Sequence, residues 1–113
     1  MNVEEFTEYC MSKPGVTGEF PFNATTLVFK VMGKMWALTN LEGDWTIFLK
    51  CDPERAIELR ERYPAIQGAF HMNKTHWNSL SMDGSLSTKM ILELTDHSYQ
   101  LVVEKLPKNK KPL

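Results

Sequence analysis

The sequence predicts a two-layer α+β domain, in which helices cover one face of an antiparallel sheet and the element order is α-β(3)-α-β(2)-α. Helical patterns occur at both ends and in the middle of the chain, and short β-rich runs lie between them. The runs are joined by connections of hairpin length, which require neighbouring strands to be antiparallel. With 113 residues and 42% hydrophobic residues, residues 1–113 are expected to form a single domain.

The first predicted element is a helix within residues 1–13. Asn2 and Glu5 have the spacing of a capping box, in which each side chain satisfies the other residue's backbone N–H. The helix must end before Pro14, because proline disfavours helical geometry in the residue that precedes it. Residues 14–26 hold two prolines and two glycines and are interpreted as an extended connection.

Three strands are predicted next, over residues 27–32, 35–40 and 45–50, where β-branched, aromatic and large apolar residues are frequent. Gly33 and Lys34 separate the first two strands. Glycine at the first central position is typical of a type II′ hairpin turn, so Lys34 is expected at the tip of this hairpin. A second hairpin loop is expected over residues 41–44.

Asp52 and Pro53 predict the start of the second helix, because Asp52 can accept a hydrogen bond as N-cap and proline suits the first helical position. Pro64 should end this helix. Two short strands are then predicted within residues 69–82, around Asn73-Lys74-Thr75. A helical turn over residues 73–76 is the alternative for the centre of this segment.

The last predicted element is a long helix that Ser87 caps and that runs to about Leu106. The segment that follows, residues 107–113, holds two prolines. Four lysines and no acidic residue lie between Lys105 and Lys111. Such a composition is typical of a solvated chain end, so residues 107–113 are expected to be a basic, frayed tail.

Charge and cysteine content exclude several classes of protein. The chain has 13 Lys and Arg against 14 Asp and Glu, a net charge of −1 and a pI near 6.3, far from the strongly basic balance of many nucleic-acid binders. The acidic N-terminus is unlike a signal peptide, and no apolar run is long enough to span a bilayer. Cys10 and Cys51 form no CxxC pattern, so we expect free thiols and a cytoplasmic location. Because no apolar run is long enough, no membrane partner is expected.

The most unusual stretch is residues 71–78, which hold two histidines, two asparagines, one lysine and one tryptophan. One interpretation is a polar recognition surface on which Trp77 offers a ring for stacking. The other is a hairpin whose polar groups satisfy its own backbone, with Trp77 in the core. His71 and His76 would lie on opposite faces of a strand, and zinc needs further ligands, so no metal site is predicted.

No catalytic centre and no cofactor are predicted. Asp96-His97-Ser98 has the letters of a hydrolase triad, but consecutive residues of a helix point about 100° apart and cannot converge on one substrate. The glycine pairs match neither a P-loop nor a dinucleotide fingerprint, so no small-molecule ligand is implied. The protein is therefore expected not to be an enzyme.

Several segments, in order along residues 14–107, resemble the MmcQ/YjbR family: Pro14-Gly15-Val16-Thr17, Phe20-Pro21-Phe22, Lys50-Cys51-Asp52-Pro53, His71-Met72-Asn73-Lys74, His76-Trp77-Asn78 and Asp96-His97-Ser98-Tyr99. The departures are at single positions, such as Gln67-Gly68. The resemblance implies the order α-β(3)-α-β(2)-α, similar to type III secretion chaperones, and DNA binding through a double-wing motif with no catalytic motif.

Two functions follow as hypotheses. In the first, lysines at two hairpin tips, Lys34 and Lys74, straddle double-stranded DNA, and binding is weak and electrostatic because the net charge is −1. The further contacts would come from Lys50, Arg60, Arg62, His71, Asn73 and His76, with stacking on Trp77. In the second, the chain is a small chaperone-like or adaptor-like module that binds a protein partner or a second copy of itself and no nucleic acid.

Overall fold

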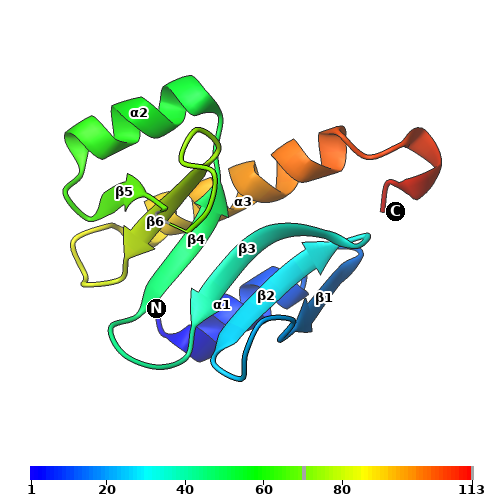
Figure 1. Ribbon diagram of the computed structural model, residues 1–113, viewed down its shortest axis with the longest axis horizontal. Coiled ribbons are helices and arrows are strands. Elements are labelled where there is room, and N and C mark those ends of the chain that lie inside the picture. The colour runs from blue at the N-terminus through cyan, green and yellow to red at the C-terminus, as the bar shows by residue number, and fades with distance from the viewer. Residues whose placement is uncertain (70, 113) are drawn as a thin grey trace.

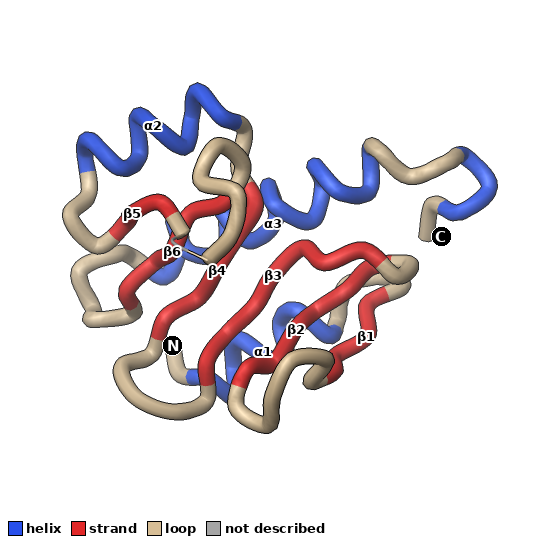
Figure 2. Tube along the Cα trace, viewed as in Figure 1, coloured by secondary structure: helices blue, strands red, loops and turns tan. Residues whose placement is uncertain are grey.

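The computed structural model describes residues 1–69 and 71–112. Its helices and strands are, in order, α1 (Val3–Met11), β1 (Val16–Glu19), β2 (Thr26–Val31), β3 (Lys34–Asn40), β4 (Thr46–Lys50), α2 (Pro53–Arg62), β5 (Ile66–Gly68), β6 (Trp77–Ser81), α3 (Thr88–Glu104) and the short 3₁₀ helix η1 (Lys108–Lys110). The strands form one sheet in the order β1-β2-β3-β4-β6-β5, and each neighbouring pair is antiparallel (Figures 1 and 2).

Helices pack on one face of this sheet, which confirms the predicted two-layer α+β class. In Figure 1, α1 and α3 pass behind the sheet, and α2 lies beside β5 and β6. The core between the layers contains fully buried side chains from α1 and from the central strands, including Phe6, Phe29, Trp36 and Ile47. The opposite face of the sheet carries a smaller apolar cluster, because successive strand residues point to opposite faces.

The predicted helix caps are all present. The Asn2 side chain accepts the Glu5 N–H at 2.8 Å while Glu5 accepts the Asn2 N–H at 3.0 Å, which completes the capping box of α1. Asp52 accepts the Arg55 N–H, and Ser87 accepts the Met90 N–H. These short-range signals fix where each helix begins.

The connection predicted over residues 14–26 contains a strand, β1. Val16 pairs with Val31 of β2, and Glu19 pairs with Val28. Three of the four β1 residues are exposed, so the strand has no apolar alternation that its sequence could reveal. Its pairing with β2 is what makes it a strand, and the chain therefore has four strands before α2 in place of three.

The first central hairpin turns at Met32 and Gly33, one residue earlier than predicted. Both residues have positive φ, 49° and 84°, and Val31 pairs directly with Lys34. Positive φ at both central positions defines a type I′ turn in place of the expected type II′ turn. As a result, Lys34 is the first residue of β3 and does not lie at the tip.

Between β3 and β4, the two strands part at one end. The pairing of β3 with β4 covers residues 37–39 of β3. On its other side, β3 pairs with β2, and a register shift there leaves Trp36 as an extra residue in β3. The fully buried Ser98 hydroxyl of α3 fills the gap: it donates to the Trp36 carbonyl and accepts the Lys50 N–H at 2.9 Å. We call this helix-bridged gap between Trp36 and Lys50 the seam.

The polar stretch after β5 forms a turn. The Asn73 carbonyl accepts the N–H groups of His76 and Trp77 at 3.1 and 2.9 Å, which is the helical turn that the sequence left open as an alternative. The strands predicted within residues 69–82 are displaced accordingly, since β5 ends at Gly68 and β6 begins at Trp77. Phe70, which falls in this predicted segment, lies outside the described residues.

The C-terminal segment includes η1, and the Lys111 ammonium donates to the Glu104 carbonyl at 3.2 Å. The frayed tail stays a prediction, and its last residue lies outside the described residues. Along the part of the chain that is described, each helix is too short or too polar to cross a bilayer. The cytoplasmic location also stays a prediction.

Candidate functional site

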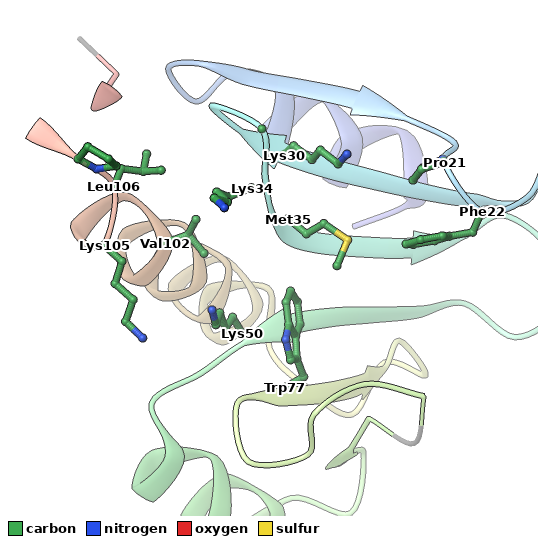
Figure 3. A pocket seen from close by; sticks show the side chains of 12 residues that line it. Pro21, Phe22, Lys30, Lys34, Met35, Lys50, Trp77, Val102, Lys105 and Leu106 are labelled. Carbon is green, nitrogen blue, oxygen red and sulfur yellow. The ribbon is translucent and has the colours of Figure 1, made fainter. Parts of the chain in front are cut away.

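A cleft with two ends of different chemistry lies beside the seam. Figure 3 shows the side chains that line its first end. The first end is a cavity of about 630 Å³, bounded by the β2–β3 hairpin, the end of β4 and the C-terminal part of α3. Among the residues that the structure describes, four lysines and no carboxylate line it: Lys30, Lys34, Lys50 and Lys105. We call this cavity the basic end.

The four lysines differ in their surroundings. The Lys30 ammonium lies 2.7 Å from the Glu19 carboxylate, so its charge is already paired. Burial, and after it the positive charge of Lys105, lowers the pKa of Lys50. Figure 3 shows Lys105 extending from α3 on the Lys50 side of the cavity, while Lys34 comes from β3. An anion bound here would relieve the repulsion between Lys50 and Lys105.

The second end of the cleft is a cavity of about 650 Å³ on the sheet face turned away from α1 and α3. Its apolar lining residues are Phe22, Met35, Leu38, Phe48, Met72 and Trp77, and no lysine, arginine or carboxylate is found among its described lining residues. Polar side chains, among them His71 and Asn73, complete its wall. We call this cavity the apolar end.

Phe22, Met35 and Trp77 line both cavities, so the two ends adjoin at these three side chains. Trp77 is 8% exposed and packs with Val28 and Leu38 in the smaller apolar cluster. Its position agrees with the core interpretation of this residue, because most of its surface is already covered. Phe22 is the aromatic ring that is open to a ligand, with 64% of its surface exposed.

The structure brings together only part of the predicted site. Lys34, Lys50, His71, Asn73 and Trp77 line the cleft. The other predicted residues line neither cavity, and they are Arg60, Arg62, Lys74 and His76.

Arg60 and Arg62 have structural partners. The Arg60 guanidinium donates to the carbonyls of Ala56 and Lys74, at 3.2 and 3.1 Å, so it joins α2 to the turn before β6. The Arg62 guanidinium lies over the ring of Tyr63, 5.7 Å from its centre. Neither guanidinium is free to reach the cleft without breaking these contacts.

Sequence reasoning missed Lys30, Lys105, Phe22 and Met35 as site residues. Lys105 lies on the helical stripe that faces the sheet. A cation on an otherwise apolar stripe could have identified it as a candidate site residue. Phe22 is a large apolar residue among prolines and glycines, where no core position is expected. The convergence of these residues depends on the order of the strands and on the seam, which no local pattern shows.

The Asp96-His97-Ser98 triplet is dispersed, as predicted. Asp96 accepts a hydrogen bond from the Tyr9 hydroxyl and pairs with the Lys13 ammonium, both at 2.6 Å. Ser98 bridges the seam. His97 accepts the Asp52 N–H through Nε2 at 3.1 Å, at the start of α2. The three side chains bind three different parts of the fold.

The thiols offer no alternative nucleophile. Both cysteines are buried and unpaired, and burial raises the pKa of Cys51 to about 11 and that of Cys10 further still. A search of residues 1–69 and 71–112 finds no cluster of three His, Cys, Asp or Glu side chains that could hold a metal ion.

His97 makes stability depend on pH. Burial and the charge of Arg55 lower the pKa of His97 below its usual 6.5, against smaller opposing effects of Asp52 and Glu104. The neutral ring accepts the Asp52 N–H, whereas the protonated ring cannot. The unfolded state thus binds the proton more readily, and stability is lost as the pH falls from about 7 through the lowered pKa.

We expect the free energy of unfolding of the wild type, from urea titrations between pH 7 and pH 5, to fall more steeply than that of His97→Gln. The glutamine variant retains a hydrogen-bond acceptor but does not titrate. Equal slopes for the two proteins would show that the pKa of His97 is the same in both states.

Comparison with known proteins identifies the family of this chain. The YjbR family model matches residues 11–101, which is more than half of the chain. The chain belongs to the YjbR family. Its YjbR-family relatives include the uncharacterised protein YjbR of Escherichia coli strain K12, 34% identical over 114 residues that cover 100% of this chain and 97% of that protein. The uncharacterised protein YbdF of Escherichia coli O157:H7 is 37% identical over 90 residues, 79% of this chain and 74% of that protein.

Solved structures share the YjbR-family fold. The crystal structure of Deinococcus radiodurans protein DR2400, family-model domain DUF419, has a TM-score of 0.92 and 37% identity over 96% of this chain and 84% of that one. The crystal structure of target PsR293 from Pseudomonas syringae has a TM-score of 0.78 and 31% identity over 89% of this chain and 98% of that one. The names of these proteins state no activity, so their similarity supports the fold and assigns no reaction.

Proposed function

We propose that this YjbR-family protein is a binding protein without catalytic activity, and that it binds DNA weakly through the basic end of the cleft. The observation that supports this is the convergence of Lys34, Lys50 and Lys105 on one cavity, to whose lining residues 1–69 and 71–112 contribute no carboxylate. Cations gathered on one surface attract phosphates even when the whole chain carries a net charge of −1.

This proposal moves the contact from the hairpin tips to the cleft. Lys34 lies on β3 and lines the basic end, whereas Lys74 lies in the turn before β6 and lines neither cavity. Phosphate contacts by a few lysines fix no base sequence, so binding should be non-specific. We expect a dissociation constant on the order of 10⁻⁴–10⁻⁶ M at physiological salt.

The test is a salt series with a duplex oligonucleotide, starting near 20 mM salt, where electrostatic binding is strongest. The Lys34→Gln/Lys50→Gln variant should reduce the slope of log affinity against log salt by about 2, because each lysine neutralises about one phosphate. The matched control is Arg62→Gln/Lys89→Gln, which removes the same charge outside the cleft and should keep the wild-type slope.

Two results would overturn the proposal. Absence of wild-type binding at about 20 mM salt would remove DNA as a ligand. Equal losses in the two double variants would show that net charge, and not the cleft, governs binding. Thermal melts of each variant must accompany the titrations, so that unfolding is not taken for lost affinity.

The second candidate is the protein-interaction module, and the observation that favours it is the exposed apolar surface. Phe20 and Phe22 are 48% and 64% exposed in one loop, beside the apolar end. Exposed apolar patches of this kind commonly mark protein contacts. This function predicts self-association that rises with concentration in sedimentation experiments and that Phe20→Asp/Phe22→Asp abolishes.

A further inference from the structure

The cleft separates charge from apolar surface along its length. In the described part of the chain, four lysines line the basic end, whereas the adjoining apolar end is lined by Phe22, Met35, Leu38, Phe48, Met72 and Trp77 and by no lysine, arginine or carboxylate. Each end, at about 630 and 650 Å³, is large enough for a small organic ligand. A phosphate backbone would use the basic end alone and would leave the apolar end empty.

The apolar end is formed before any ligand binds. Leu38 and Trp77 are 6% and 8% exposed and belong to a packed cluster with Val28, so the floor of this end is already packed. Met35, Phe48 and Met72 are only partly buried against that cluster, so their remaining surface faces the cleft. Apolar surface left open in this way is stabilised when an apolar ligand covers it.

The basic end would hold the charged part of the same ligand. Lys30 is paired with Glu19. The other lysines that line the basic end are Lys34, Lys50 and Lys105, and no carboxylate of the described part of the chain lies among the lining residues. Figure 3 shows Lys34 and Lys50 on the same side of Met35 and Trp77, opposite Phe22. A carboxylate or phosphate there would lie among the lysines of the basic end and next to the apolar end.

We propose that the cleft binds a small amphipathic anion, with an apolar body against Phe22, Met35 and Trp77 and a carboxylate or phosphate at Lys34, Lys50 and Lys105. This ligand class goes beyond the proposed function and does not rest on DNA binding. Both ligands would use the same lysines, but only the amphipathic anion would fill the apolar end.

The experiment titrates the wild-type protein by calorimetry with dodecanoate and dodecyl phosphate, each below its micellar concentration. Dodecanol below its solubility limit and acetate are titrated in the same way as controls. The two amphipathic anions should saturate at one ligand per protein and raise the melting temperature, because a ligand that binds only the folded state stabilises it. Dodecanol lacks the charge and acetate lacks the chain, so each should bind on the order of tenfold more weakly or not measurably. The carboxylate and phosphate arms also show which head group is preferred.

Two pairs of variants locate the binding. Phe22→Ala should weaken dodecanoate on the order of tenfold, whereas Phe20→Ala removes the same ring from the same loop outside the cleft lining and should have no effect. Lys34→Gln/Lys50→Gln should weaken dodecanoate more than Arg62→Gln/Lys89→Gln. Phe22→Ala should leave the salt slope of DNA binding unchanged, which separates failure of this inference from failure of the proposed function.

Three outcomes would overturn the inference. The first is binding of dodecanol as tight as that of both anions. The second is equal loss in Phe22→Ala and Phe20→Ala. The third is a melting temperature that falls with ligand and shows no stoichiometry, which is the behaviour of a surfactant adsorbed on many sites.

Discussion

Replacing Ser98 with alanine should lower the free energy of unfolding by about 2–6 kcal/mol. The Ser98 hydroxyl is the bridge across the seam, where it donates to the Trp36 carbonyl and accepts the Lys50 N–H. Ser98 is fully buried, so alanine would leave both backbone groups without a hydrogen-bond partner. Each unsatisfied buried group lowers the free energy of unfolding by about 1–3 kcal/mol. Urea titration monitored by circular dichroism measures the loss.

The matched control is Ser79→Ala. The Ser79 hydroxyl also donates to a backbone carbonyl between strands, that of Gln67 at 3.4 Å, but solvent reaches this bond. Water can replace the lost hydroxyl there, so the change should stay within about 0.5 kcal/mol. If Ser98→Ala lost no more than Ser79→Ala, the strands would hold together at the seam without the helix.

The second large effect is expected for Phe6→Ala, which should cost about 3–5 kcal/mol. Phe6 is 0% exposed, and its ring packs edge-on against Phe29 at 6.0 Å and Trp45 at 6.3 Å between ring centres. Removing the ring would leave a cavity at the point where α1 meets the sheet. This helix lies almost wholly outside the region that the family model matches, residues 11–101, so the variant tests whether it belongs to the cooperative fold.

Ile57→Ala is the control for this second variant. It also shortens a large apolar side chain on a helix, but Ile57 is 53% exposed, so the loss should be at most about 1 kcal/mol. Amide hydrogen exchange completes the measurement. Fast exchange throughout α1 in the wild type, together with a small loss in Phe6→Ala, would mean that the helix opens independently of the sheet.

Local signals in the sequence predicted most of the fold. The capping box at Asn2, the Asp52-Pro53 start and the Ser87 cap placed all three helices within a residue or two, because caps depend on a few neighbouring residues. The strand β1 was missed because its residues are mostly exposed and gain their geometry by pairing with β2. The turn at Met32 was misplaced because a positive φ at methionine is rare.

The candidate site was predicted only in part, for a different physical reason. Lys34 and Lys50 were identified as cations next to predicted turns or strand ends, and both line the cleft. Lys105 and Phe22 are far from them in the sequence and meet them only through the strand order and the path of α3 across the seam. The contacts of Arg60 and Arg62 were also not apparent from the sequence, since their partners are a carbonyl in a distant turn and an adjacent ring.

The two edges of the sheet limit how copies of this protein can associate. The outer strands β1 and β5 have four and three residues, and Pro14 and Pro21 lie just outside the ends of β1. Short edges flanked by prolines present few free backbone groups in line, so they are poor templates for a further strand from another molecule. We therefore expect the folded protein to resist the edge-to-edge growth that leads to fibrous aggregates, and any pairing of two copies to use side-chain surfaces.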